Sequence, residues 1–359
     1  MKRIGHGGDF FTAEETAAGP VLDVSANVNP LGMPEAARRA VVESLGLAER
    51  YPDPYCRVLR AKLSGCLSVP AGWMLCGNGA ADLIFRLALA ERPKNALLVA
   101  PSFSEYEAAL RAAGCAPRFY ALRAEEGFRL GKRFLEELTP ETDFAVLCNP
   151  NNPTGQLIDP GLLREIAARC EQNGVRLLVD ECFNGFLDDP ERNSLIGLLG
   201  ERSRLVLLRA FTKIYAMPGL RLGYCLSSDG ALLERMAESG PPWAVSSAAQ
   251  AAGEAALSDP DYLERTRRMI AGERAFLAEG LAALGLEVYP PEANYVFFRW
   301  RGARGEPLSA RLLRKGVLVR DCGNYRGLDS SFLRAAVRTR AENERVLAAV
   351  GGALWEAEQ

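Results

Sequence analysis

The chain has 359 residues, 48% of them hydrophobic, which is enough to fill the core of one large and one smaller domain. Its 43 Lys and Arg residues nearly balance 45 Asp and Glu residues, and no basic block offers a surface for nucleic acid or anionic lipid. The sequence opens without an apolar leader, and no apolar run approaches the length of a membrane span. We therefore expect a cytoplasmic protein that binds neither nucleic acid nor a membrane.

Residues 1–33 are polar and interrupted by Pro and Gly, which predicts an arm lying over the smaller domain or over a partner subunit. Between about residues 73 and 226, apolar runs alternate with helical stretches, the pattern of a mostly parallel sheet covered by helices on both faces. The apolar runs are Trp73–Cys76, Ala96–Ala100, Phe144–Cys148, Val175–Asp180, Leu205–Ala210 and Leu222–Leu226. The helical stretches include Ala81–Leu89, Glu105–Ala113 and Gly161–Asn173, the last ended by Gly174. We therefore assign the chain to the α/β class.

After Pro241 and Pro242 the pattern changes to longer helical stretches and fewer strands. The helical stretches are Ser246–Leu257 and Tyr262–Leu284, and the strand candidates are Glu287–Tyr289 and Tyr295–Trp300. This combination predicts a smaller α+β domain. We expect an arm over residues 1–33 that packs with the small domain, a large domain over residues 34–240 and the small domain over residues 241–359.

The nine cysteines are scattered along the chain without a CxxC pair, and their number is odd. This spacing argues against a disulfide framework, and several cysteines, such as Cys76, Cys148 and Cys225, lie in apolar runs that predict small buried side chains. The ligand spacings of a zinc site are missing as well, so we expect no metal.

The strongest local motif is Arg209-Ala-Phe-Thr-Lys213, which follows an apolar strand and precedes Arg221 by a short loop. Asp180 closes another strand, Asn152 lies in a loop after a third, and Gly77-Asn-Gly-Ala80 opens a helix. In open α/β sheets, ligands bind beyond the carboxyl ends of the strands, which is where these residues fall. Taken alone, Lys213 would be a solvated surface lysine and Asp180 a helix N-cap.

Together these motifs resemble the fold-type I enzymes that use pyridoxal 5'-phosphate (PLP), the aspartate aminotransferase superfamily, over essentially the whole chain. The resemblance implies a large domain with a mostly parallel seven-stranded sheet, and PLP as the cofactor. Lys213 would supply the amine that binds the cofactor aldehyde, provided that burial and nearby cations lower its pKa, and would then carry protons. Asp180 would keep the ring nitrogen protonated, so that the ring accepts electrons.

The same resemblance assigns the remaining cofactor contacts. The backbone N–H groups of Gly79 and Ala80, together with Thr212 and Arg221, would bind the phosphate dianion at a helix N-terminus. Asn152 would donate a hydrogen bond to the ring oxygen O3', and Phe103 would stack on the ring, although a plain core role for Phe103 is nearly as well supported. One departure stands out, because Phe183 occupies the position at which many aminotransferases have a tyrosine that contacts O3'.

Substrate recognition requires further charged groups. Arg334 lies where the superfamily keeps an arginine for the substrate carboxylate, with surface exposure as the alternative. A second anion site is suggested by Arg320 at the end of a strand-like run, by Tyr51 and by the single histidine, His6. A lone histidine is, however, more often structural.

A narrower set of motifs resembles the threonine-phosphate decarboxylases of cobalamin side-chain synthesis. The motifs are His6-Gly-Gly-Asp9, the segment 22–32, Arg50-Tyr-Pro-Asp53, the segment 322–330 and Ala341-Glu-Asn-Glu-Arg345. The resemblance implies decarboxylation of O-phospho-L-threonine to (R)-1-amino-2-propanol O-2-phosphate and carbon dioxide. It also implies a pocket for this small phosphorylated amino acid, formed by His6, Asn29, Tyr51, Asn152, Arg320 and Arg334. The enzyme would be a homodimer in which the loop of Tyr51 crosses the subunit boundary.

Three alternatives stay open on the sequence alone. A histidinol-phosphate aminotransferase has the same architecture, but Phe183 and the His6-Gly-Gly arm argue against it. Phosphoserine differs from phosphothreonine by one methyl group, so the same site could decarboxylate it. A PLP-fold binding protein without catalysis would be expected to lack Lys213 or Asp180, and both are present.

Overall fold

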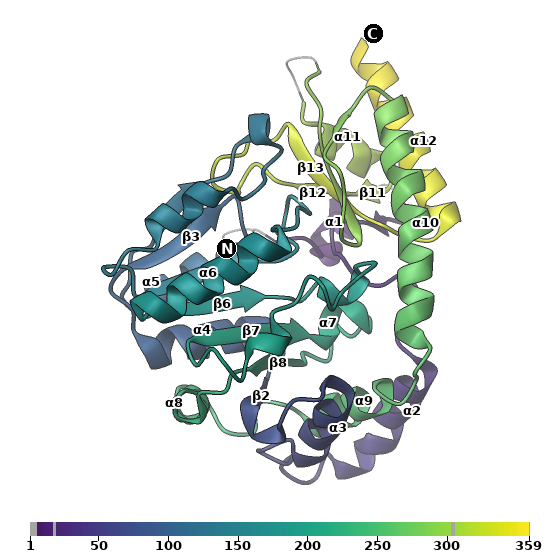
Figure 1. Cartoon of the computed structure of the whole chain (residues 1–359). Coiled ribbons are helices and arrows are strands. Elements are labelled where there is room, and N and C mark those ends of the chain that lie inside the picture. Colours follow the sequence, from purple (N-terminus) through teal and green to yellow (C-terminus); the bar gives the residue numbers. More distant parts are fainter. Residues whose placement is uncertain (1–5, 17–18, 303–305, 359) are drawn as a thin grey trace.

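A computed structural model describes residues 6–16, 19–302 and 306–358, and its centre is a seven-stranded sheet (Figure 1). The order of its strands is β2-β8-β7-β6-β5-β3-β4, and β8 runs opposite to the other six strands. The strands are β2 (Met74–Gly77), β3 (Ala96–Ala100), β4 (Arg118–Ala121), β5 (Phe144–Cys148), β6 (Arg176–Asp180), β7 (Leu205–Ala210) and β8 (Gly223–Leu226). This architecture confirms the predicted α/β class and the mostly parallel seven-stranded sheet.

Helices cover both faces of the sheet because alternate side chains of each strand point to opposite faces. Leu98, Val146 and Leu178 pack in one hydrophobic cluster with α4 (Gly79–Glu91), α5 (Ser104–Ala112) and α8 (Gly230–Glu238). Val99, Leu147 and Val179 pack on the other face with α6 (Pro160–Asn173). Helix α6 begins after Asp159, whose carboxylate accepts a hydrogen bond from the Leu162 backbone N–H, and ends at Gly174 in the left-handed conformation, as predicted.

A second sheet of four antiparallel strands lies above the first in Figure 1. Its order is β12 (Arg320–Asp321), β13 (Phe332–Ala336), β10 (Tyr295–Arg299) and β9 (Glu287–Val288). The helices of this region are α10 (Tyr262–Ala283), α11 (Leu308–Arg314) and α12 (Arg340–Glu358). The N-terminal strand β1 (Leu22–Asp23) pairs in parallel with β11 (Val317–Leu318), so this part of the predicted arm is tied to the C-terminal region.

Helices α2 (Glu35–Ser44), α3 (Arg57–Leu67) and α9 (Ser247–Ala256) pack together at the lower end of the molecule in Figure 1. Helix α10 runs from there to the upper sheet, so the chain after residue 241 contacts both regions. The predicted domain limits stay predictions. Among the described residues, no helix is both long enough and apolar enough to cross a bilayer.

Several short elements complete the chain. They are the helices α1 (Phe10–Thr16) and α7 (Phe211–Ile214) and the 3-10 turns Leu45–Leu47, Ala71–Trp73, Ala124–Glu126, Lys132–Glu137, Asn184–Phe186 and Ile196–Leu198. Helix α7 carries Lys213 directly after β7, so this short helix sets the position of the predicted cofactor-binding lysine.

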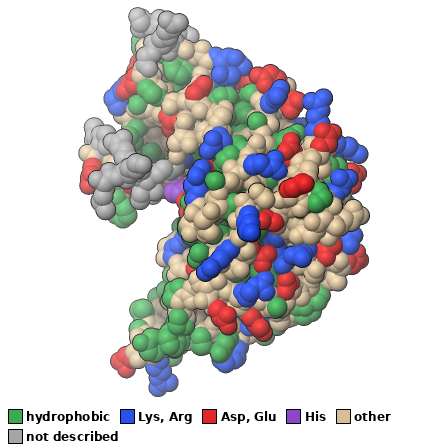
Figure 2. Space-filling model, turned by 90° about the vertical axis from the view of Figure 1, so that its left-hand side faces the viewer, with side chains coloured by type: hydrophobic (Ala, Val, Ile, Leu, Met, Phe, Trp, Pro, Cys, Tyr) green, Lys and Arg blue, Asp and Glu red, His purple; other side chains and the backbone are tan. Residues whose placement is uncertain are grey.

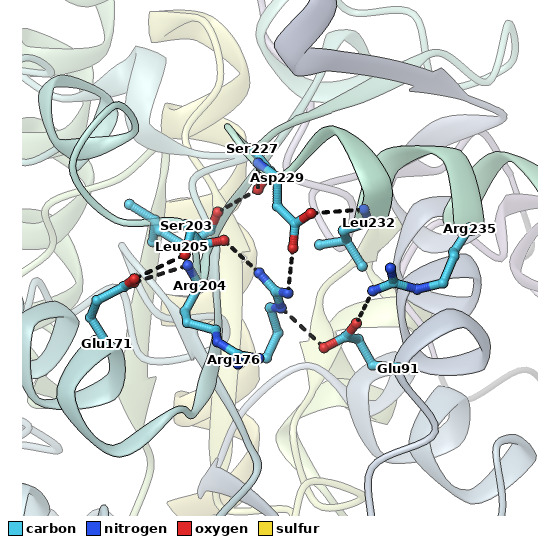
Figure 3. A network of polar contacts seen from close by, with 10 residues as sticks. All are labelled: Glu91, Glu171, Arg176, Ser203, Arg204, Leu205, Ser227, Asp229, Leu232 and Arg235. Carbon is cyan, nitrogen blue, oxygen red and sulfur yellow. Dashed lines mark hydrogen bonds and ion pairs between the residues drawn. The ribbon is translucent and has the colours of Figure 1, made fainter.

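A buried ion network fixes the edge of the large sheet at which β6 begins (Figure 3). Arg176, whose side chain is 3% exposed, contacts Glu91 at 3.1 Å and Asp229 at 2.8 Å, and donates to the Ser203 carbonyl at 2.6 Å. Asp229 also accepts a hydrogen bond from the first turn of α8, and Glu91 pairs with the exposed Arg235. One guanidinium therefore joins the end of α4, the start of β6 and the start of α8.

Replacing Arg176 should destabilise the protein far more than replacing Arg235. Arg176→Ala leaves two partly buried carboxylates without their cation, which should lower the free energy of unfolding by about 3 to 5 kcal/mol. Arg235→Ala removes one exposed partner of Glu91 and should lower it by less than about 1 kcal/mol. Urea unfolding of the cofactor-free protein, followed by circular dichroism, measures both. Equal losses in the two variants would contradict this view of the network.

Candidate active site

A cavity of about 440 Å³ lies at the carboxyl ends of the central strands, between the large sheet and the C-terminal region. In Figure 2 the histidine side chain, in purple, lies beside a hollow in this face of the molecule. Side chains from the arm, the large sheet and the C-terminal strands all reach the cavity. Its lining includes His6, Ser25, Asn27, Ala80, Phe103, Glu105, Tyr106, Cys148, Asn152, Asp180, Cys182, Phe183, Thr212, Lys213, Arg221, Tyr325 and Arg334.

Lys213 projects into this cavity from the last turn of α7. Burial lowers the pKa of its ammonium group to about 8, and the nearby charges of Arg334 and Arg221 act in the same direction. The backbone N–H of Asn29 donates to the Lys213 carbonyl at 3.1 Å, and its side-chain amide donates to the Ile214 carbonyl at 2.7 Å. At pH 7 about a tenth of Lys213 is therefore an uncharged, nucleophilic amine, far more than for a lysine with the ordinary pKa.

Asp180 ends β6 and is buried on the cavity wall. The Tyr106 hydroxyl donates to one carboxylate oxygen at 2.6 Å, and the Cys182 backbone N–H donates to the other at 2.9 Å. Burial raises the pKa of Asp180, and these hydrogen bonds oppose the rise only in part. Both donors are uncharged, so the positive charge that would stabilise an ionised Asp180 is not supplied by them. A cation bound in the cavity beside Asp180 would therefore strongly favour the ionised carboxylate.

The N-terminus of α4 forms a receptor for an anion beside Arg221. Gly79 has a φ of +82°, and a Cβ atom there would lie 2.6 Å from Nη2 of Arg221. Only glycine therefore allows the guanidinium to approach the first turn of the helix. The Asn78 side chain does not cap this end, so the backbone N–H groups of the first turn and the Arg221 charge are available to one ligand.

The substrate side of the cavity combines Arg334 with the N-terminal arm. Arg334 is 5% exposed, and its Nη2 donates to the Ser25 carbonyl at 2.7 Å, while its Nε is buried without a partner among the described residues. His6 Nε2 lies 2.7 Å from Glu105 Oε1, and this hydrogen bond lowers the pKa of Glu105. A Cβ at Gly7 would lie 2.2 Å from the Ser25 carbonyl oxygen, so glycine allows the arm to lie directly on the segment that follows β1.

Three predicted substrate residues do not line this cavity. Asn29 lies behind Lys213, where its amide also donates to Thr266 at 2.8 Å. Tyr51 is 78% exposed and stacks on Trp243, with 4.4 Å between ring centres. Arg320 lines an adjoining cavity of about 280 Å³, donates to Asn324 at 2.6 Å and lies over the ring of Tyr325. Their roles toward the substrate stay predictions.

Three side chains that border the cavity could not be found from local motifs. Tyr106, Glu105 and Tyr325 each contact a predicted site residue, but their partners lie 74, 99 and 173 positions away in the chain. No short sequence pattern brings such pairs together. Phe183 does line the cavity, and its ring packs edge-on against Tyr295 at 5.1 Å.

Residues 19–350 match the family model described as aminotransferase class I and II. The chain belongs to this family. Threonine-phosphate decarboxylase of Salmonella typhimurium is 41% identical, over 97% of this chain and 96% of its own length. The crystal structure of histidinol-phosphate aminotransferase from Clostridium acetobutylicum is 30% identical, with a TM-score of 0.86 over 92% of this chain and 98% of its own. L-threonine-O-3-phosphate decarboxylase from Porphyromonas gingivalis is 27% identical, with a TM-score of 0.81 over the same shares.

PLP is the cofactor of this class I and II aminotransferase family member, and the cavity fits it. The Lys213 amine suits the aldehyde, the Asp180 carboxylate suits a protonated ring nitrogen, and the α4 N-terminus with Arg221 suits the phosphate. Phe103 and Asn152 border the same space. Nine of the thirteen residues predicted for the site thus line one cavity, and Gly79 supports it from behind.

The lowered pKa of Lys213 predicts how cofactor capture depends on pH. The uncharged amine attacks the aldehyde, so the rate at which cofactor-free protein captures PLP should rise with pH and level off above about 8. Stopped-flow absorbance measures this rate. Arg334→Met removes a nearby positive charge and should move the midpoint upward. A wild-type rate that still rises at pH 10, as for a lysine with the ordinary pKa, would contradict the assignment.

Proposed function

We propose that this protein decarboxylates O-phospho-L-threonine to (R)-1-amino-2-propanol O-2-phosphate and carbon dioxide, for cobalamin side-chain synthesis. The observation that carries the proposal is the 41% identity to a threonine-phosphate decarboxylase along almost the whole of both chains. The cavity supports it, because basic groups from two sides, Arg334 and His6, border the same space as Lys213. We further propose a cytoplasmic location, where the nine cysteines would stay free thiols.

The residues of the cavity have separate roles in this reaction. Bound PLP supplies an electron sink for the negative charge left at the substrate α-carbon when carbon dioxide departs. Asp180, whose carboxylate is buried on the wall of the cavity, would hold the proton on the ring nitrogen. The Lys213 amine, with a pKa near 8, holds a proton that it returns to the α-carbon.

Substrate orientation selects decarboxylation over other reactions of the same cofactor. We assign the carboxylate to Arg334 and the phosphate to His6 and Arg320, which would hold the substrate at both ends and so fix its orientation while carbon dioxide leaves. Asn29 and Tyr51 complete the proposed set, Asn29 by supporting α7 from behind and Tyr51 from the neighbouring subunit. Binding energy from the phosphate then helps to hold the reactive orientation.

Two alternative reactions are compatible with the same pocket. The similarity to the Clostridium acetobutylicum structure, at a TM-score of 0.86, supports histidinol-phosphate aminotransferase activity as the second candidate. Decarboxylation of phosphoserine differs only by the methyl group of the substrate. Product analysis separates all three.

The purified protein with PLP should convert O-phospho-L-threonine to aminopropanol phosphate and carbon dioxide without 2-oxoglutarate. Phosphorus NMR and mass spectrometry identify the products, and phosphoserine and histidinol phosphate serve as competing substrates. Asp180→Asn should still bind PLP but lose more than about 100-fold in turnover, because the ring nitrogen loses its charged partner. A keto or aldehyde product that forms only with 2-oxoglutarate would instead favour the aminotransferase.

We also propose that the protein is a homodimer. Large apolar side chains are exposed at the lower end of the molecule, where green side chains gather in Figure 2, and such a surface supports a protein–protein interface there. The exposed side chains there are Val42, Leu45, Leu47, Tyr51, Tyr55, Val58 and Trp243. The stacked pair of Tyr51 and Trp243 belongs to the same surface, which fits a Tyr51 that reaches the site of the neighbouring subunit.

Mixing two inactive variants tests this sharing. Tyr51→Ala and Lys213→Ala subunits, each inactive or nearly so alone, should regain activity when mixed, because one site of each heterodimer contains neither defect. Random pairing of equal amounts should give about a quarter of wild-type turnover. In the control mixture Asp180→Asn replaces Tyr51→Ala, and activity should not recover, because Asp180 and Lys213 line the same cavity of one subunit and every site keeps one defect. No recovery in a mixture that sedimentation shows to contain heterodimers would contradict a shared site.

A further inference from the structure

The amide of Asn152 is held by two donors at one of its atoms. Nη1 of Arg334 and the hydroxyl of Tyr325 both donate to Oδ1 of Asn152, the latter at 3.3 Å. Because the oxygen accepts both hydrogen bonds, the orientation of the amide is fixed. The amide nitrogen, which carries two hydrogens, is then left as the group that can donate to a ligand in the cavity.

Tyr325 is well suited to hold this amide. It is 8% exposed and lies in the loop between β12 and β13, which brings it against a residue of the loop after β5. Burial raises the pKa of its phenol, so the hydroxyl stays protonated and acts as a donor. The guanidinium of Arg320 lies over its ring, 5.0 Å from the ring centre, which restrains the ring as well.

Phe183 increases the importance of this arrangement. Its ring borders the cavity and carries no hydroxyl, so it provides no hydrogen bond to the cofactor. Asn152 thus contributes more of the hydrogen bonding to the ring oxygen of PLP than it would if a tyrosine stood at position 183. A change in its orientation should therefore alter the charge on that oxygen directly.

We propose that Tyr325 is a positioning residue, which together with Arg334 orients the Asn152 amide so that its N–H groups bind the ring oxygen of PLP. The inference assumes that PLP binds in the cavity, and it does not depend on which substrate reacts. A hydrogen bond to the oxygen stabilises its negative charge. Weakening this bond should raise the pH at which the bound cofactor loses its proton, an event that changes the absorbance spectrum.

Tyr325→Phe removes the hydroxyl and keeps the ring against Arg320. In the PLP-bound enzyme, without substrate, the midpoint of the spectral change should move upward by about 0.5 to 1 pH unit, the size expected for a weakened hydrogen bond. Tyr289→Phe is the matched control, because this buried tyrosine donates to Glu287 at 3.0 Å and does not line the cavity. Its midpoint should equal that of the wild type.

A double-variant comparison tests whether Tyr325 acts through Asn152. Asn152→Ala should raise the midpoint at least as far as Tyr325→Phe does, and adding Tyr325→Phe to Asn152→Ala should then change nothing further. An unchanged midpoint in Tyr325→Phe would overturn the proposal, and so would an equal shift in both backgrounds. Because the spectrum is read without substrate, a failure here differs from a failure of the proposed decarboxylation.

Discussion

The whole site depends on the burial of an amine and a carboxylate in one cavity. Burial acts on both groups in the direction that removes charge, since it lowers the pKa of Lys213 and raises that of Asp180. The cofactor reverses the situation for Asp180, because a protonated ring nitrogen favours the carboxylate, while the neutral lysine is the form that binds the aldehyde. The same walls that disfavour charge in the cofactor-free site therefore prepare it for PLP.

The sheet and the C-terminal strands bring these groups together. Parallel strands direct their carboxyl ends to one edge, so Asp180 at the end of β6 and Lys213 after β7 share a cavity. The Arg176 network holds the opposite edge of the sheet, where β6 begins. The edge at the carboxyl ends of the strands is the one that binds the ligand. Arg334 and Tyr325 approach from the C-terminal strands and meet Asn152, so that the substrate side and the cofactor side share one hydrogen-bonded group.

Much of this fold could be predicted from the sequence, because buried strands are continuous apolar runs. β3, β5 and β7 have the predicted limits, whereas β4 was missed, since Arg118–Ala121 is an edge strand without a buried residue. The cofactor residues follow strand ends, which sequence reveals. The contacts of Tyr106, Glu105 and Tyr325 depend on how distant segments pack, and no local pattern encodes them. For Asn29, the motif placed the residue near Lys213, but it could not show that the side chain points away from the cavity, toward Ile214 and Thr266.

The central claim is that the buried amine of Lys213 is the group that binds the cofactor. Borohydride reduction of the PLP-bound protein, followed by proteolysis and mass spectrometry, tests it most directly. We predict that the pyridoxyl group is found on the peptide that contains Lys213 and that the label is lost in Lys213→Ala. A label on another lysine, or an undiminished label in Lys213→Ala, would contradict the account.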